Sequence, residues 1–161
     1  MRSFGITVAA VLALALGLAA CSDSTPRYGG AGSSTSTSSA ASGGAAAVDT
    51  ASVGDLGTVL VDGSGRTLYL FESDTGSTST CTGTCAGTWP AMTTTGDPTA
   101  GMGASASMLG TTTRDDGSTQ VTYNGHPLYR FAGDQAPGDT NGQGVGGIWW
   151  VVSPAGDPIE S

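Results

Sequence analysis

Tyr69-Leu70-Phe71-Glu72-Ser73-Asp74 recurs as Tyr129-Arg130-Phe131-Ala132-Gly133-Asp134, a Tyr-x-Phe-x-x-Asp hexamer repeated after sixty residues. The same shift aligns glycine, apolar and tryptophan positions: Gly57 with Gly117, Val61 with Val121, Gly65 with Gly125, Leu68 with Leu128, Gly87 with Gly147 and Trp89 with Trp149. A fold constrains such positions, so internal duplication explains the matches better than chance. We predict two repeats, at about 52–95 and 112–155, joined by a link at 93–113.

Each repeat is predicted to open with a β-hairpin. In the second, residues 119–123 and 126–131 flank Asn124-Gly125, a dipeptide that accepts the positive φ angles of a type I′ turn. In the first, residues 58–61 and 66–71 flank a longer turn at 62–65. A third strand is expected at 147–152 and, more weakly, at 89–92, while residues 106–111 could add a short strand within the link.

The predicted fold class is therefore all-β. Two tandem three-stranded antiparallel meander repeats are expected to pack into one small domain, 51–161, because neither meander alone buries a sufficient core. Period-two alternation places Tyr69 and Phe71 on one strand face and Leu68 and Leu70 on the other. Because Arg130 replaces Leu70 in the second copy, the Tyr/Phe face is the better candidate for the shared core.

The N-terminal residues have the features of an export signal. The apolar run at 6–20 is long enough for a signal peptide but short for a bilayer span. It ends in Leu18-Ala19-Ala20-Cys21, which resembles the bacterial lipobox. The resemblance implies a signal peptide at 1–20, cleavage before Cys21, and a lipid on Cys21 that holds the protein on the extracytoplasmic face of the bacterial cell membrane.

Residues 21–50 are rich in Ser, Thr, Gly and Ala. Such a composition buries too little apolar surface to offset the entropy of ordering, so we expect a disordered tether. The alternative is that this segment forms a receptor-binding or glycosylated stalk. The net charge of -8 disfavours nucleic acid and anionic lipid surfaces as partners, because both would be repelled.

Around the hexamers the chain resembles a family of bacterial secreted lipoproteins with a tandem Tyr-x-(aromatic)-x-x-Asp repeat. The segments that carry the resemblance in the second repeat are 109–111, 114–117, 123–129 and 138–144, and in the first repeat they are Cys81, Cys85, Trp89 and Pro90. The resemblance covers about 52–155 together with the lipobox. It implies a surface lipoprotein and no particular reaction.

Cys81 and Cys85 remain once Cys21 is lipidated. Four residues apart in an oxidising compartment, they most simply form a disulfide. The alternative is a copper-binding or thiol-redox pair, assisted by Met92 or by His126. This alternative lacks a second ligand cluster nearby in the sequence.

Other polar residues allow two interpretations each. Asp74 and Asp134 follow their strands, where a carboxylate can close a turn, or could project with the tyrosines into a ligand groove. Asp139, Asn141 and Gln143 alternate as in calcium loops, but Trp150 stands where an EF-hand needs Glu, so a turn is the simpler interpretation.

Five residues are candidates for ligand contact: Trp89, Tyr123, His126, Trp149 and Trp150. His126 could act as a base, but no nucleophile or carboxylate pattern surrounds it, and an exposed hairpin residue is the simpler interpretation. Of Trp149 and Trp150, one should be buried while the other could stack on a sugar or a partner.

The sequence thus predicts a lipid-anchored, non-enzymatic β-repeat lipoprotein that requires no cofactor and binds or supports an unidentified component of the cell envelope. The alternative function is a copper or redox lipoprotein that uses Cys81 and Cys85.

Overall fold

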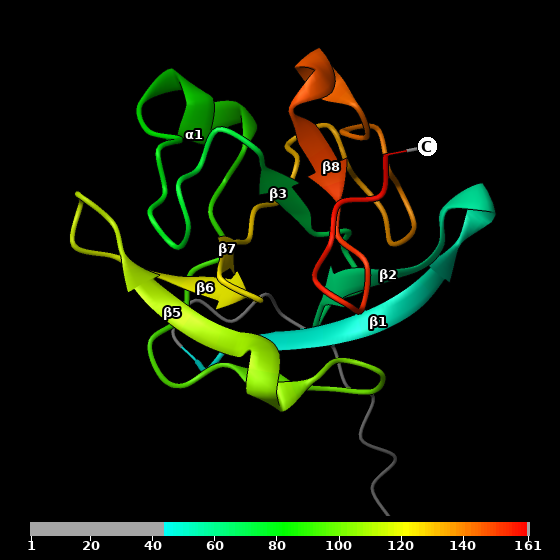
Figure 1. The fold of residues 1–161 in the computed structure, drawn as a ribbon, viewed down its shortest axis with the longest axis horizontal. Coiled ribbons are helices and arrows are strands. Elements are labelled where there is room, and N and C mark those ends of the chain that lie inside the picture. The colour runs from blue at the N-terminus through cyan, green and yellow to red at the C-terminus, as the bar shows by residue number, and fades with distance from the viewer. Residues whose placement is uncertain (1–43, 161) are drawn as a thin grey trace, which may run out of the picture. The chain divides into compact units, whose positions relative to one another are not determined.

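The computed structural model describes residues 44–160. The predicted signal peptide, Cys21 and the predicted tether up to residue 43 lie outside the described residues. The structure is mostly β, with three small sheets whose strand orders are β2-β1-β4, β3-β8 and β5-β6-β7 (Figure 1). The elements are β1 (Ala47–Val53), η1 (Gly54–Leu56), β2 (Gly57–Asp62), β3 (Tyr69–Phe71), α1 (Thr84–Thr88), β4 (Thr99–Ala100), η2 (Ala106–Met108), β5 (Leu109–Thr113), β6 (Thr119–Tyr123), β7 (His126–Pro127), η3 (Val145–Gly147) and β8 (Trp149–Val151).

Strand β1 corrects the predicted C-terminal limit of the tether. β1 begins at Ala47 and pairs antiparallel with β2, with Val48 opposite Asp62 and Val53 opposite Gly57. Val48 and Val53 are buried. The Ala, Ser and Thr residues between them suggested disorder, but pairing with β2 orders the strand despite its composition.

Both predicted hairpins form. Val61 bridges Thr67 in the first, and Tyr123 pairs with His126 in the second. Asn124 and Gly125 have φ angles of 49° and 82°, as a type I′ turn requires. No helix within residues 44–160 is both long and apolar enough to cross a bilayer.

The two hairpins differ in length by one residue. The Leu68 N–H donates to the Leu60 carbonyl, whereas the Leu128 N–H donates to the Val121 carbonyl. Leu60, and not Val61, therefore occupies the place of Val121, so the sixty-residue shift becomes sixty-one before the turn. The carboxylate of Asp62 closes the longer turn by accepting hydrogen bonds from Ser64 and Arg66.

The third strand of each repeat crosses to the other repeat, so the predicted self-contained meanders are wrong. β8 pairs antiparallel with β3 of the first repeat, with Phe71 opposite Trp149. Reciprocally, Ala91 bridges Tyr129, and the Arg130 N–H donates to the Pro90 carbonyl. Alternation in the sequence had identified strands and faces, but it does not determine which hairpin a strand joins.

The two hexamers meet directly. The Tyr69 N–H donates to the Tyr129 carbonyl at 2.9 Å, and the Tyr129 N–H donates to the Tyr69 carbonyl at 2.9 Å. This reciprocal exchange is a hydrogen-bonded antiparallel pair. An approximate local twofold axis therefore passes between the two tyrosines and relates the repeats.

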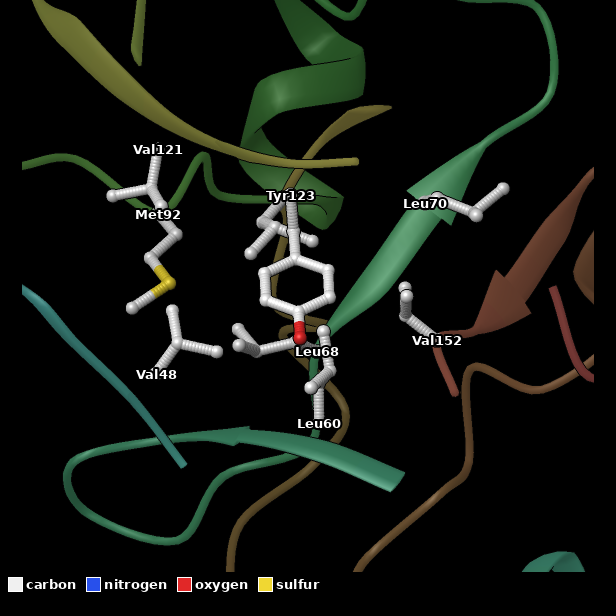
Figure 2. Close-up of a cluster of buried hydrophobic side chains, with 9 residues drawn as sticks. Val48, Leu60, Leu68, Leu70, Met92, Val121, Tyr123 and Val152 are labelled. Atoms are coloured by element: carbon white, nitrogen blue, oxygen red, sulfur yellow. The ribbon is translucent and has the colours of Figure 1, made fainter. Parts of the chain in front are cut away.

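The extended segments through Tyr69 and Tyr129 have two faces, and each face is buried in a different core. The first core contains Val48, Leu60, Leu68, Leu70, Met92, Val121, Tyr123, Leu128 and Val152 (Figure 2). The second contains Val53, Val59, Val61, Tyr69, Cys81, Trp89, Tyr129, Trp149 and Val151. The Tyr/Phe face is thus one of two buried faces, not the single shared core.

Leu70 and Arg130 occupy equivalent strand positions with different surroundings. Leu70 is buried in the first core, whereas Arg130 is half-buried and its Nε lies 2.6 Å from Oδ2 of Asp62. Burial alone would raise the pKa of Asp62, but hydrogen bonds from Ser64 and the charge of Arg130 hold that pKa below its usual value.

The link is more ordered than a loop. β4 pairs in parallel with the start of β1, with Ala47 opposite Thr99. The strand suggested at 106–111 is divided, because Ala106–Met108 is a 3-10 turn and β5 begins at Leu109. β5 pairs antiparallel with β6.

Candidate functional site at the junction of the repeats

The tyrosine of each hexamer binds the aspartate of the other hexamer. The Tyr69 hydroxyl donates to Oδ2 of Asp134 at 2.6 Å, and the Tyr129 hydroxyl donates to Oδ2 of Asp74 at 2.6 Å. Both tyrosines are 0% exposed and Asp134 is 1% exposed. Within one hexamer, Tyr and Asp would lie on opposite faces of an extended strand, so a hydrogen bond between them would require a bend in the chain. A bond between the two hexamers requires no such bend.

The second carboxylate oxygen of each aspartate holds its own loop. Oδ1 of Asp74 accepts the Thr80 N–H at 2.7 Å and the Thr80 hydroxyl at 2.8 Å. Oδ1 of Asp134 accepts the Asn141 N–H at 2.9 Å and the Asn141 side-chain amide at 3.2 Å. Each aspartate therefore joins a loop of its own repeat to the tyrosine of the other.

This environment favours the neutral tyrosines. Burial, followed by the hydrogen bond to Asp74, raises the pKa of Tyr129 to about 12. Burial and the hydrogen bond to Asp134 raise the pKa of Tyr69 well above its ordinary value. A phenol whose proton is held in this way is a poor general acid or base near neutral pH.

Four aromatic rings form a stack beside these hydrogen bonds. Trp89 and Trp149 are parallel with centroids 3.9 Å apart, Phe71 stacks on Trp149 at 4.1 Å, and Phe131 lies 4.6 Å from Trp89. The Tyr69 and Tyr129 rings meet the two indoles edge-on, at 5.3 and 5.2 Å. Each Trp thus contacts the Phe of the opposite repeat, and both indoles are only 4% exposed.

The predicted ligand-contact residues do not form one surface. Trp89 and Trp149 are buried in the second core, and Tyr123 is buried in the first. The Tyr123 hydroxyl accepts the Ser105 N–H and donates to the Pro154 carbonyl. His126 and Trp150 are half-buried, so of the five candidates only these two retain appreciable exposed surface.

Cys81 and Cys85 form a disulfide in the structure, with Cα atoms 5.3 Å apart. The Cys85 carbonyl accepts the Trp89 N–H at 2.8 Å, so the disulfide loop is attached directly to the aromatic stack. Met92, proposed as a helper in copper binding, belongs to the other core. Among residues 44–160, no three His, Cys, Asp or Glu side chains gather closely enough to hold a metal ion.

The predicted calcium ligands serve separate partners. Oδ2 of Asp139 accepts backbone N–H groups from Ala136 and Gln135, which lower the pKa of that carboxyl. Asn141 donates to Asp134, and Oε1 of Gln143 accepts the Val151 N–H at 2.9 Å. The segment is thus arranged as a set of turns.

Arg114 is a site residue that sequence reasoning did not single out. It is 8% exposed and donates to Oε1 of Gln120 at 2.7 Å, to the Cys81 carbonyl at 2.6 Å and to the Ser79 hydroxyl. Ser79 Oγ lies 2.7 Å from the Tyr129 hydroxyl, so the guanidinium connects β5 to the Tyr129–Asp74 pair. Its sequence signals are an arginine in a chain with few cations and a place in the segment 114–117 that carries the family resemblance.

An open depression lies beside Arg114. It is lined by Thr82, Gly83, Ala86, Arg114, Asp115 and Asp116. The guanidinium beneath it is already bonded within the protein, and the two exposed carboxylates would repel an anion. The depression therefore offers neither a paired acid and base nor an anion site.

Replacing Gly142 with alanine should destabilise the junction. A Cβ at this position would lie 2.7 Å from Trp89 and 3.0 Å from Tyr69, closer than a packed core accepts. We expect G142A to lower the free energy of unfolding by about 1–3 kcal/mol, the usual cost of overpacking. Urea denaturation measures it, and the control is G87A, whose added Cβ would have no neighbour within 4 Å. Equal stability of the two variants would contradict the packing described.

Stability should fall at alkaline pH. The folded-state pKa of Tyr129 is raised to about 12 from an unfolded value of about 10. The contribution of the neutral phenol is therefore complete below pH ~10 and is lost as the pH rises through ~12, a loss of about 1–3 kcal/mol. The chain has no Lys to obscure this titration. Urea denaturation between pH 8 and 12 should show the decline, and Y129F should reduce it; a flat profile would contradict the assignment.

Comparison with known proteins places these observations in a family. The family described as "Secreted repeat of unknown function", Lipoprotein_15, matches residues 50–93 and 110–153, close to the two predicted repeats. No curated protein and no solved structure matches the chain. The two matched segments cover more than half of the chain and contain both hexamers. The chain therefore belongs to the Lipoprotein_15 family of secreted repeats.

Proposed function

We propose that this chain is a lipid-anchored, non-catalytic module of the bacterial cell envelope that binds or supports another envelope component. One observation carries the proposal: the polar groups of the repeated motif bind each other. The Tyr69 and Tyr129 hydroxyls and the carboxylates of Asp134 and Asp74 join the two repeats. The repeated motif thus stabilises the domain, and we assign the binding function to other residues on the surface of the domain.

The anchor is supported by two independent features. Leu18-Ala19-Ala20-Cys21 follows an apolar segment, as in lipoprotein signals. The family to which the repeats belong carries lipoprotein in its name and is described as secreted. A diacylated cysteine would hold the domain at the membrane without a spanning helix.

The non-catalytic part of the proposal rests on the state of the reactive side chains. The buried hydroxyls of Tyr69 and Tyr129 have raised pKa values. His126 is half-buried at the start of β7, where it pairs with Tyr123 of β6. Copper binding would require Cys81 and Cys85 as thiols, and in the structure they are joined as a disulfide.

Replacing Cys21 with alanine should abolish the attachment of lipid. In producing bacteria given an alkyne-tagged fatty acid, the wild-type chain should carry the tag and sediment with membranes. The C21A chain should carry no tag, because the thiol that receives the lipid is absent. It should also retain residues 1–20 and run as a longer chain, because the lipobox that directs cleavage is lost.

A matched control is the double variant C81S/C85S, which retains Cys21 and should keep both the tag and the membrane association. A tag on C21A as strong as that on the wild-type chain would overturn the anchor. A tag that persists on C21A but disappears from C81S/C85S would show that another cysteine is modified.

A further inference from the structure

We propose that the outer edge of β5 is a self-association surface, on which β5 of a second copy of this chain pairs antiparallel, with Thr111 opposite Thr111. The observation behind it is an unpaired strand edge. β5 is the terminal strand in the order β5-β6-β7, and it pairs with β6 from Leu109 opposite Tyr123 to Thr113 opposite Thr119 (Figure 1).

The register shows which backbone groups point outward. The Asn124 N–H donates to the Met108 carbonyl, and the Arg114 N–H donates to the Ser118 carbonyl. Backbone hydrogen-bonding groups alternate in direction along a strand. The N–H and C=O groups of the even-numbered residues of β5 therefore point toward β6, and those of Leu109, Thr111 and Thr113 point away from it. Within residues 44–160, no backbone hydrogen bond reaches the outward groups of Thr111 and Thr113, whereas the Leu109 N–H donates to the Ala106 carbonyl.

The first repeat shows that the equivalent edge can accept a strand. Thr50 is opposite Leu60, and Thr111 is opposite Val121. Because Leu60 and Val121 occupy the same place in the two hairpins, Thr50 and Thr111 are equivalent positions. On β1 the Thr50 N–H donates to the Met102 carbonyl, and the Val48 carbonyl accepts the Gly101 N–H. The second repeat lacks such a covering strand within the described part of the chain.

The composition of β5 does not oppose pairing. Natural edge strands are usually protected by lysine, proline or a bulge. β5 reads Leu-Gly-Thr-Thr-Thr, without charge or proline, and Thr111 and Thr113 are exposed. Threonines that face one another across strands form favourable pairs.

A second copy fits this edge because the outward groups are self-complementary. Centred on Thr111, an antiparallel pair places Leu109 of each copy opposite Thr113 of the other. The two Thr111 residues then exchange N–H···O=C bonds, and the Thr113 N–H reaches the Leu109 carbonyl of the other copy. This is the isologous arrangement that closes as a dimer. Strand addition of this kind draws its affinity chiefly from the main chain.

Charge selects the antiparallel direction. Asp115 and Asp116 follow β5 and are exposed. In a parallel pair these carboxylates would lie side by side and repel. In the antiparallel pair the two Asp115 residues are about 25 Å apart at ~3.3 Å per residue, well beyond a screening length of ~8 Å.

Cysteine crosslinking of the full chain, purified from producing cells, tests both contact and register. Directly opposed residues have Cα atoms ~5.5 Å apart, within disulfide reach, so oxidised T111C should give about tenfold more covalent dimer than T113C. The pair L109C/T113C should also crosslink, because each cysteine is opposite the other in the second copy. The wild-type chain measures any background from Cys21.

Two results would overturn the proposal. One is equal crosslinking of T111C and T113C, which would indicate parallel pairing or random collision. The other is dimer from T111C and from L109C/T113C no higher than in the wild-type chain. Adding T111K to L109C/T113C should abolish that dimer, because two lysines would face each other at an exposed position that the monomer does not use; persistence of the dimer would place the contact elsewhere.

Discussion

Two backbone hydrogen bonds between Tyr69 and Tyr129 set the geometry on which the other cross-repeat contacts depend. Because each tyrosine is paired with its counterpart, its side chain is directed into the opposite repeat, where its hydroxyl reaches the aspartate of that repeat at 2.6 Å. The carboxylates of Asp74 and Asp134 then bind the loops that lead to Trp89 and Trp149, and each tryptophan packs against the opposite repeat. A repeated hexamer thus acts as a reciprocal joint, and the buried tyrosine and carboxylate satisfy each other's hydrogen-bonding demand.

This arrangement makes the repeats interdependent. Each hairpin is completed by a strand from the other repeat, β8 beside β3 and Ala91 beside Tyr129. The indoles of Trp89 and Trp149 stack on the axis between the repeats. Neither core is therefore closed by one repeat alone, and we expect residues 44–160 to unfold as one cooperative unit. The repeats diverge away from the axis, where a disulfide loop in one corresponds to the Asn141 loop in the other.

The sequence predicted the parts of this fold better than their connections. The duplication, the β class and the Asn124-Gly125 turn follow from residue spacing and turn chemistry, which are local properties. The exchange of third strands does not, because alternation in a strand defines its faces and not its neighbour. β1 escaped detection because pairing with β2 orders a segment whose Ala, Ser and Thr content suggested disorder. The role of Arg114 depends on contacts with residues as distant as Ser79, which no local pattern indicates.

The most direct test of this account is a pair of double-mutant cycles in urea denaturation. One cycle combines Y69F with D134A, across the repeats, and the other combines Y69F with D74A, within one hexamer. The account predicts a coupling energy of about 1–3 kcal/mol for the first cycle and below about 0.5 kcal/mol for the second. Stronger coupling within the hexamer than across the repeats would contradict the reciprocal joint.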